Sequence, residues 1–483
     1  MATVKTINAG RLAMLLGPDA LAGTPAYRSL ADAIRLVVTD GRVSPGTRLP
    51  SERELTSALG TSRTTVTAAY GELKERGYLV SRQGSGSVAT LPGGGGEVSR
   101  HAIIPRADEP GGDVIDLTCA ILAASPGVAA AYEAALTELP LWLTRGGYDA
   151  AGLPQLRDVV ADRYTSRGLP TDPDQIVVTT GAVSGLAITL RALVRTGDRL
   201  LIENPAYPNA VDTAIHTGAR LTTLPLDPDG WDLDLLDATL RQTSPRLALL
   251  VPDYHNPTGL LMPDADREAA ARMLRRNRTS TVIDETMADL ALGEDPTPLP
   301  FAAYDDDVFS LGSISKSFWG GIRVGWIRAP HDMVTRVLES RATLDLSTPV
   351  VEQLVAAHLL SRRDEILPER RALLRERRDA LVSALRRELP DWDVPVPAGG
   401  MSLWCRLPER ISSRLVSAAE RHGLALAAGS RFGVDGGFEQ YLRVPYGYPV
   451  DVLEEAARRL AAAYVDALTT TTGTETVRRP LIA

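Results

Sequence analysis

The apolar positions of residues 26–90 predict a small helical unit. Tyr27, Leu30, Ala31, Ile34 and Val38 recur at the spacing of one helix face. The segments that follow carry polar residues where helices can start and a glycine where one can end. We therefore expect three helices in this part of the chain.

The second and third helices are predicted from their caps. Ser51 and Glu54 form a capping box, and Gly60 ends the helix that they begin. After a tight turn, Ser62 can cap a third helix with a buried face of four apolar residues. This face consists of Val66, Ala69, Tyr70 and Leu73. Two strand-like segments, 77–80 and 87–89, then flank a glycine-rich tip. Helix, turn, helix and hairpin together predict a winged helix-turn-helix.

Beyond Val114, short apolar runs alternate with amphipathic helical stretches. The runs with strand character are 175–179, 199–202, 247–251, 281–283, 308–311 and 324–327. Helical stretches at 153–167 and 264–275 lie between some of them. This alternation predicts an α/β fold, with a mostly parallel sheet covered by helices. The long charged helix and the strands within 362–467 predict a smaller α+β lobe.

Four consecutive glycines, Gly93–Gly96, mark the main boundary, because a run of glycines stabilises no regular element. We assign residues 1–90 to the helix-turn-helix head, 91–113 to a flexible linker and 114–467 to the body. Residues 468–483 lack apolar periodicity and are predicted to form a loose tail.

Composition limits the class of protein. The 483 residues are 44% apolar and 23% charged, which is ordinary for a globular protein in water. No apolar run is long enough to span a bilayer, and the N-terminus lacks a signal-peptide pattern. The two cysteines, Cys119 and Cys405, have no metal-binding spacing and provide no disulfide framework. We therefore expect a cytoplasmic protein without a bound metal.

Charge divides unevenly along the chain. Residues 1–90 carry 11 Lys and Arg against 7 Asp and Glu, a net charge of +4, which leaves −12 for the remainder of a chain whose total is −8. A basic head on an acidic body predicts that only the head meets a polyanion.

Exposed side chains at the start of the third helix predict DNA reading. Arg63, Thr64 and Thr67 lie opposite its buried face and can reach base edges and phosphates. Arg48 and Arg53 would anchor the DNA backbone, and the glycine tip lets main-chain amides approach a groove. For each arginine taken singly, a solvated surface residue is the alternative.

Lys316 ends the segment Ser-Ile-Ser-Lys, with Arg323 seven residues on and Gly325 just after it. A lysine amine can condense with an aldehyde while an arginine beside it holds a phosphate, as pyridoxal 5′-phosphate chemistry requires. We expect burial and neighbouring positive charge to lower the pKa of Lys316.

Two further segments suit the same cofactor. Gly181, Ala182 and Val183 follow a strand and open a helix, so their free amides can hold a phosphate, although a plain strand-to-helix turn would use the same residues. Asp284 ends a strand, where its carboxylate could pair with a protonated ring nitrogen.

Asn256 and Tyr207 are weaker candidates. Asn256 follows a strand and could donate to the phenolic oxygen of the cofactor ring, but its Asn-Pro-Thr-Gly context also suits a turn. Tyr207 could stack on the ring, or it could be an ordinary packing aromatic.

The segment GTRLPSERELTSALGTSRTTVTAAYGELKERGYLVSRQGSGS resembles the winged helix-turn-helix of GntR-type bacterial regulators over its whole length. The resemblance implies binding to a double-stranded DNA operator. The predicted DNA-binding residues are Arg48, Ser51, Arg53, Ser62, Arg63, Thr64, Thr65, Thr67, Gln83 and Gly84. Members of the family often have arginine where Thr67 stands.

Residues 114–467 resemble fold type I aminotransferases, and the whole chain resembles MocR-type regulators of the GntR superfamily. The resemblance implies that Lys316 carries pyridoxal 5′-phosphate, with Asp284 on the ring nitrogen and Asn256 on the phenolic oxygen. It places seven further residues around the ring and the phosphate, namely Tyr207, Ser313, Ser315, Arg323, Gly181, Ala182 and Val183.

Two more residues follow from the same resemblance. Tyr148 would reach the phosphate of the partner subunit, because these sites form at the interface of a homodimer. Arg443 would bind the carboxylate of a substrate or effector. An arginine inside an apolar strand needs an anion, which an internal carboxylate would supply as well.

The chain departs from the aminotransferase pattern in two places. Thr286 and Met287 stand where a tyrosine commonly follows the ring-nitrogen aspartate, so the tyrosine's hydrogen bond to the phenolic oxygen is absent. Trp319 and two glycines replace the usual Pro-Gly approach to the phosphate arginine.

These features predict a transcriptional regulator whose body senses a small amine, such as an amino acid, through aldimine chemistry at Lys316. In a variant of this hypothesis the coenzyme itself is the signal. The alternative is a catalytically active aminotransferase that carries a DNA-binding head, and a DNA-binding scaffold with an empty pocket is a third possibility. The sequence names neither the effector nor the operator.

Overall fold

The computed structural model describes residues 6–22, 25–39, 43, 47–82, 86–90, 114–293 and 297–469. Three predicted features fall outside these residues: the wing-tip contacts at Gln83 and Gly84, the linker 91–113, and the tail beyond residue 469. The predicted domain boundaries remain predictions.

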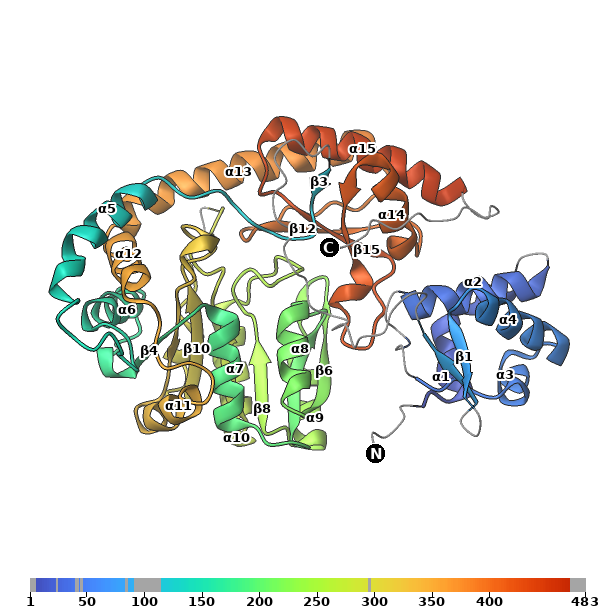
Figure 1. Ribbon diagram of the computed structural model, residues 1–483, viewed down its shortest axis with the longest axis horizontal. Coiled ribbons are helices and arrows are strands. Elements are labelled where there is room, and N and C mark those ends of the chain that lie inside the picture. The colour runs from blue at the N-terminus through green and yellow to red at the C-terminus, as the bar shows by residue number, and fades with distance from the viewer. Residues whose placement is uncertain are drawn as a thin grey trace.

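The head contains the three predicted helices and the predicted hairpin, and it carries one further helix (blue in Figure 1). Its elements are α1 (Ala9–Leu16), α2 (Ala26–Thr39), α3 (Glu52–Leu59), α4 (Arg63–Glu75), β1 (Leu79–Arg82) and β2 (Gly86–Ala89). The strands pair antiparallel, with Leu79 opposite Ala89. Helix α1 was not predicted. Its N-cap is Asn8, whose side chain accepts a hydrogen bond from the Arg11 amide, and it buries Leu12.

The predicted caps of the head are confirmed. Ser51 and Glu54 form a reciprocal capping box on α3, and Gly60 ends this helix in the left-handed conformation. Ser62 caps α4, which buries the four predicted apolar residues. These residues join Leu30, Ile34 and Leu55 in a single core.

The body is built on an eight-stranded sheet in the order β4-β11-β10-β9-β8-β5-β6-β7. The strands are β4 (Ile176–Thr179), β5 (Arg199–Asn204), β6 (Arg220–Asp227), β7 (Gly230–Trp231), β8 (Leu247–Leu250), β9 (Ser280–Asp284), β10 (Val308–Ser313) and β11 (Gly325–Arg328). The central strands pair parallel, whereas β11 and β7 pair antiparallel with their neighbours. Strands β6 and β7 were not predicted.

Helices cover both faces of this sheet, as the alternation of apolar runs predicts (Figure 1). They are α5 (Val128–Glu138), α6 (Pro154–Ser166), α7 (Ala182–Leu193), α8 (Pro208–His216), α9 (Leu233–Thr243), α10 (Asp264–Arg276), α11 (Val334–Arg341) and α12 (Val350–Ser361). Successive residues of a strand point to opposite faces. Val178 therefore lies in the core beneath α6 and α12, whereas Val177 lies in the core beneath α7 and α8.

The smaller lobe contains α13 (Arg363–Glu388), β12 (Ser402–Arg406), α14 (Ser412–Ala419), β13 (Leu424–Ala425), β14 (Ala427–Ala428), β15 (Tyr441–Pro445) and α15 (Val450–Thr469). Strand β3 (Ile115–Asp116) also belongs here, because it pairs parallel with β13. The sequence placed the start of this lobe near residue 362 and so missed this early strand. Helix α15 extends two residues past the predicted end of the body.

Candidate functional site

The carboxyl ends of the central strands bring the predicted body residues together. Asp284 is the last residue of β9, and Lys316 follows the end of β10. In open α/β sheets, ligands bind at this edge. The charges of Asp284, Arg323 and Arg443 each act on the pKa of Lys316, which places these groups within one site.

Lys316 presents an unusually acidic amine. Its Nζ donates a hydrogen bond of 2.7 Å to the carbonyl oxygen of Ala120. Burial, followed by the positive charges of Arg443 and Arg323, lowers the pKa of Lys316 from 10.5 to about 8. Part of the population is therefore unprotonated near neutral pH, and only the unprotonated amine is a nucleophile. The predicted direction of the pKa shift is confirmed.

Lysine is rare in this chain, so the presence of Lys316 in the site is informative. Of the 52 basic Lys and Arg residues, only Lys5, Lys74 and Lys316 are lysines. Arginine stays protonated in proteins and cannot act as an amine nucleophile. The body thus uses arginine wherever a positive charge suffices and keeps its one lysine beside Asp284.

The lowered pKa makes the stability of the cofactor-free protein depend on pH. Because the folded pKa of Lys316 lies below the unfolded value, protonation of this amine opposes folding by about 3 kcal/mol below pH 8. Between pH 8 and 10.5 the unfolded chain binds more protons than the folded chain, so this penalty disappears as pH rises. We expect apo Lys316→Met to be more stable than the apo wild type at pH 7, and to lose that advantage near pH 10. Urea unfolding at both pH values measures the difference, and an equal gain at both would contradict the assignment.

The residues predicted to hold the phosphate lie in the same site as this lysine. Gly181 caps α7 with a φ of 111°, and a side-chain Cβ there would lie 2.7 Å from an Arg323 guanidinium nitrogen. Arg323 donates to the carbonyl oxygen of Thr180 at 3.0 Å. The missing side chain of Gly181 makes room for the Arg323 guanidinium. This arginine and the free amides of Ala182 and Val183 suit a phosphate group.

The serines of the predicted motif complete the predicted phosphate site. Strand register places Thr179, Gly325 and Ser313 in one row across β4, β11 and β10. The Ser313 hydroxyl accepts a hydrogen bond from the Ser315 amide at 3.2 Å and lies 3.1 Å from the Ser315 hydroxyl. These contacts hold the turn that leads to the reactive lysine.

The residues predicted around the cofactor ring are also placed in this site. Burial raises the pKa of Asp284, and a hydrogen bond of 2.9 Å from the Thr286 amide opposes that rise. Thr286, which departs from the family pattern, therefore supports the aspartate through its backbone. Burial raises the pKa of Tyr207 to about 12, and the charges of Arg443 and Asp284 act on this phenol. A buried carboxylate is stabilised by a positive partner, and a protonated ring nitrogen has the required charge.

Arg443 lies in the middle of β15 and is 2% exposed. Its guanidinium lies 4.8 Å above the ring of Phe432, donates to Asn256 Oδ1 at 3.4 Å and contacts the carbonyl oxygen of Thr118. Burial lowers the pKa of Arg443 to about 10. Its Nε has no hydrogen-bond partner in the described part of the chain, and no carboxylate there pairs with it. The internal carboxylate considered as an alternative is therefore not found among the described residues.

Tyr148 does not join the site of its own chain. Its side chain is 76% exposed. Four leucines of the same region are exposed as well, namely Leu141, Leu143, Leu344 and Leu346. Cys119, in contrast, was not predicted and lies in the site, where its thiol interacts with Arg443 and Lys316. No spacing signal in the sequence could have found it.

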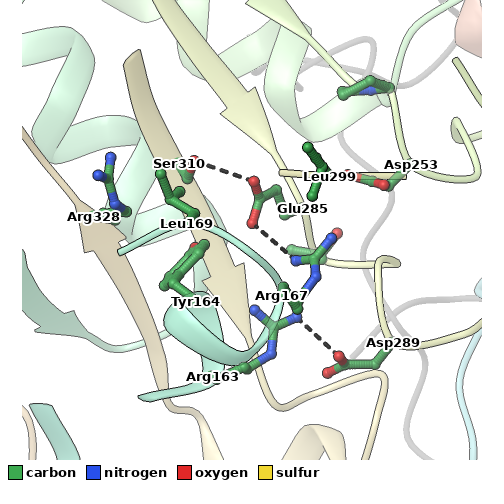
Figure 2. Close-up of polar contacts among 12 residues, drawn as sticks. Arg163, Tyr164, Arg167, Leu169, Asp253, Glu285, Asp289, Leu299, Ser310 and Arg328 are labelled. Atoms are coloured by element: carbon green, nitrogen blue, oxygen red, sulfur yellow. Dashed lines mark hydrogen bonds and ion pairs between the residues drawn. The ribbon is translucent and has the colours of Figure 1, made fainter. Parts of the chain in front are cut away.

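A buried ionic network contacts the residues that follow Lys316 and Asp284 in the chain; Figure 2 shows its ion pairs. Arg163 of α6 pairs with Asp289 at 2.9 Å, and Asp289 accepts a hydrogen bond of 3.0 Å from Ser317, the residue after Lys316. Arg167 lies 3.6 Å from Glu285, the residue after Asp284. Helix α6 thus holds the strand ends that carry both reactive side chains.

The carboxylates of this network respond to burial in opposite ways. Burial would raise the pKa of Asp289, but the guanidiniums of Arg163 and Arg167 lower it below its ordinary value. Burial raises the pKa of Glu285 despite the nearby Arg167. Sequence reasoning missed this network because Arg163 and Asp289 stand 126 positions apart.

Some of the predicted DNA-binding residues of the head are exposed, whereas others are engaged in helix caps. Arg53, Arg63 and Thr64 are exposed on α3 and at the start of α4. Capping contacts occupy the hydroxyls of Ser51 and Ser62; the Ser62 hydroxyl also lies 2.8 Å from that of Thr65.

Two predicted contacts have intramolecular partners. The Thr67 hydroxyl donates to Glu52 at 2.7 Å. The backbone of Arg48 forms an antiparallel β-bridge with Val88 of the hairpin, and the Arg48 guanidinium lies beside Gly86.

Comparison with known proteins agrees with this architecture. Residues 26–88 match bacterial regulatory proteins of the gntR family, and residues 144–460 match the family aminotransferase class I and II. The uncharacterized HTH-type transcriptional regulator YisV of Bacillus subtilis (strain 168) is 27% identical over 479 residues, which cover 92% of this chain and 98% of the relative. The probable rhizopine catabolism regulatory protein MocR of Rhizobium meliloti is 28% identical over 444 residues, covering 86% and 88%.

Solved structures give the same fold for the body. LysN, an α-aminoadipate aminotransferase from Thermus thermophilus complexed with N-(5′-phosphopyridoxyl)-L-leucine, has a TM-score of 0.69 and 28% identity, covering 74% of this chain and 94% of that one. No helix in the described ranges has the length and apolar character needed to cross a membrane.

Fold and site together define a protein that joins a gntR-type helix-turn-helix to an aminotransferase body. The chain belongs to the aminotransferase class I and II family, and the predicted resemblance to MocR-type regulators of the GntR superfamily is confirmed. The predicted fold class is confirmed as well. Membership in the family implies pyridoxal 5′-phosphate as the cofactor, and the gntR-type head implies DNA binding.

Proposed function

We propose that this protein is a transcriptional regulator whose body binds pyridoxal 5′-phosphate at Lys316 and senses a small amine, with an amino acid as the preferred class. One observation carries the proposal. A lysine of lowered pKa and a buried arginine with an unpartnered Nε share one site, in a chain that also carries a helix-turn-helix.

Each residue of the site has a proposed role toward the cofactor. When bound, pyridoxal 5′-phosphate supplies an aldehyde that condenses with primary amines and a ring that withdraws electrons. Lys316 provides the anchoring amine, and Asp284 keeps the ring nitrogen protonated. Asn256 donates to the phenolic oxygen and Tyr207 packs against the ring. The phosphate group is assigned to Arg323, Ser313, Ser315 and the amides of Gly181, Ala182 and Val183.

Arg443 gives the site its proposed preference for a carboxylate. An incoming amino acid would place its carboxylate on this guanidinium, whose buried Nε lacks a partner in the described part of the chain. Burial strengthens such a charged contact because little water competes with it. The ligand can change DNA binding only through unequal affinity for two forms of the body.

We further propose that the protein is a homodimer. Leu141, Leu143, Leu344 and Leu346 are exposed, as is Tyr148, and Arg341 joins the two segments by donating to the carbonyl oxygen of Ala150. Monomeric proteins rarely leave large apolar patches in water. A partner subunit would cover the leucines and receive Tyr148 at its phosphate. The gntR-type head also supports the proposal that the protein acts in the cytoplasm, where it would meet DNA.

The regulator and the enzyme differ in their experimental outcomes. Footprinting on DNA upstream of the protein's own gene should show a protected site whose occupancy changes with an amine. The alternative, a catalytically active aminotransferase, is favoured by the similarity of the body to LysN. Steady amino-group transfer without any protected DNA would establish the enzyme and reject the regulator.

The Arg63→Ala variant tests the head. Arg63 is 76% exposed on its side chain and lies 4.0 Å from its nearest acid, Glu52, so its guanidinium is free to reach DNA. We expect the variant to weaken specific DNA binding by about 1–3 kcal/mol and to leave cofactor uptake intact.

Arg28→Ala is the matched control for this prediction. It removes the same charge from the exposed surface of α2, a helix without predicted DNA contacts. Loss of cofactor from Arg63→Ala would show that the head and the body are not independent. Equal DNA affinity of both variants would remove Arg63 from the interface.

A further inference from the structure

Four arginines line up along the amino edge of the large sheet, on the side opposite the cofactor site. Arg246 immediately precedes β8, whereas Arg199 and Arg220 begin β5 and β6. Arg278 precedes β9 by two residues. In Figure 1 this edge lies at the bottom of the body, near the label of α10.

Backbone hydrogen bonds fix the order of this row. The Arg246 amide donates to the carbonyl oxygen of Arg199, and the Ser280 amide of β9 donates to that of Arg246. Arg199 and Arg220 face each other in the parallel register of β5 and β6. Neighbouring strands lie about 4.8 Å apart, so four successive strands spread the row over about 14 Å.

This arrangement is unfavourable for the isolated chain. Like charges on directly opposed residues of neighbouring strands repel each other. All four arginines are exposed, and none forms an ion pair with an acid in the described ranges. The nearest acid in the row is Asp198, and it accepts a hydrogen bond from the Arg195 amide to cap its own turn. Other arginines of the same surface do have acidic partners, as Arg241 has in Asp237.

Two of the four guanidiniums are nevertheless held in place. Arg199 donates to the carbonyl oxygen of Thr243 at 2.9 Å, and Arg246 donates to that of Leu193 at 3.4 Å. Such contacts orient a guanidinium without neutralising its charge. The four arginines line an open hollow of about 520 Å³, together with Gly197, Asp198, Ser244, Pro245 and Asn277.

We propose that this arginine row binds the phosphodiester backbone of DNA, outside the contacts made by the head. A solvent-exposed row of positive charges without acidic partners matches an extended polyanion better than a small enclosed ligand. The body as a whole carries a net negative charge, whereas the arginine row is a local region of positive charge. The inference rests on the proposed DNA-binding function, and it revises the expectation that only the head meets a polyanion.

The salt dependence of DNA binding by the full-length protein tests this inference. The row variant combines Arg199→Gln, Arg220→Gln and Arg246→Gln. The matched control combines Arg241→Gln, Arg272→Gln and Arg276→Gln, which remove three arginines that pair with acids of the same helices or their neighbours. The probes are the DNA fragment upstream of the protein's own gene and a long duplex of mixed sequence.

We expect the row variant to reduce the slope of log affinity against log salt by about 2–3 on both probes, because each lost phosphate contact removes about 0.9 from the slope. The control variant should keep the slope of the wild type. The side chain of Arg220 makes no hydrogen bond in the described ranges, so Arg220→Gln alone should leave the fold intact. This single variant should reduce the slope by about 1, and it tests the inference even if the triple variant misfolds.

The remaining outcomes reject the inference in distinguishable ways. Equal slopes for the row variant, the control and the wild type would overturn it while leaving the proposed regulator intact. If inorganic phosphate stabilises only proteins with an intact row while all slopes stay equal, the hollow is a small-anion site and the DNA proposal is wrong. If the wild type binds neither probe, the proposed function fails together with the inference.

Discussion

The Lys316→Ala variant is expected to emerge from gel filtration with no pyridoxal 5′-phosphate, whereas the wild type should retain about one cofactor per chain. The variant removes the only lysine beyond residue 74. The predicted phosphate site would survive, since Gly181 and Arg323 are unchanged, but reversible contacts alone allow the cofactor to leave during separation. Cofactor absorbance relative to protein measures the result.

Lys74→Ala is the matched control, because it removes the other lysine within a described helix and lies near the end of α4 in the head. It should retain the cofactor in full. Lys316→Ala should also keep the affinity of the wild type for DNA in the absence of amines, but DNA binding should no longer respond to them. Cofactor absorbance that persists unchanged in Lys316→Ala would exclude both sensing and catalysis through this lysine.

The second large effect concerns the buried ionic network that includes Asp289. Asp289→Asn leaves the Arg163 guanidinium, 4% exposed on its side chain, without its carboxylate. Removing one partner of a buried ion pair destabilises a protein by about 3–5 kcal/mol. We expect a loss of this size in the free energy of unfolding of the body. All six tryptophans lie beyond residue 141, so tryptophan fluorescence during urea unfolding follows the body and not the head.

Asp364→Asn provides the comparison for this measurement. Asp364 is 91% exposed and lies 3.7 Å from Arg363 at the surface. Such pairs contribute about 0–1 kcal/mol, so this variant should unfold almost like the wild type. If both substitutions cost the same, the buried ionic network does not hold the site in place.

Much of the fold follows from local patterns in the sequence. The head was predicted because its caps are local, as with Ser51 and Glu54 three residues apart. The central strands were predicted because strands buried on both faces read as continuous apolar runs. Strand β6, in contrast, is only partly buried and contains two threonines and a proline, so its apolar signal is weak.

The candidate site was predictable for residues that stand at the end of a strand or at the start of a helix, because such positions can be recognised from the local sequence. Asp284 at a strand end, Gly181 at a helix start and Lys316 after a strand are all of this kind. Their assembly into one site follows from the rule that ligands bind at the carboxyl edge of a parallel sheet. The roles of these residues toward the cofactor remain predictions.

Contacts between distant segments could not be predicted in this way. Cys119 reaches the site only because the chain returns beside β15, and nothing in its own segment indicates this. The arginine row depends on the order of the strands, since Arg199, Arg220 and Arg246 become neighbours only when β6, β5 and β8 pair. A single sequence contains no signal for that order.

Borohydride reduction of the purified wild-type protein, followed by peptide mass mapping, tests the central claim most directly. The account predicts a phosphopyridoxyl group on the peptide that contains Lys316, and none on the peptides that contain Lys5 or Lys74. An unmodified Lys316 peptide from protein reduced in the presence of the cofactor would contradict the account.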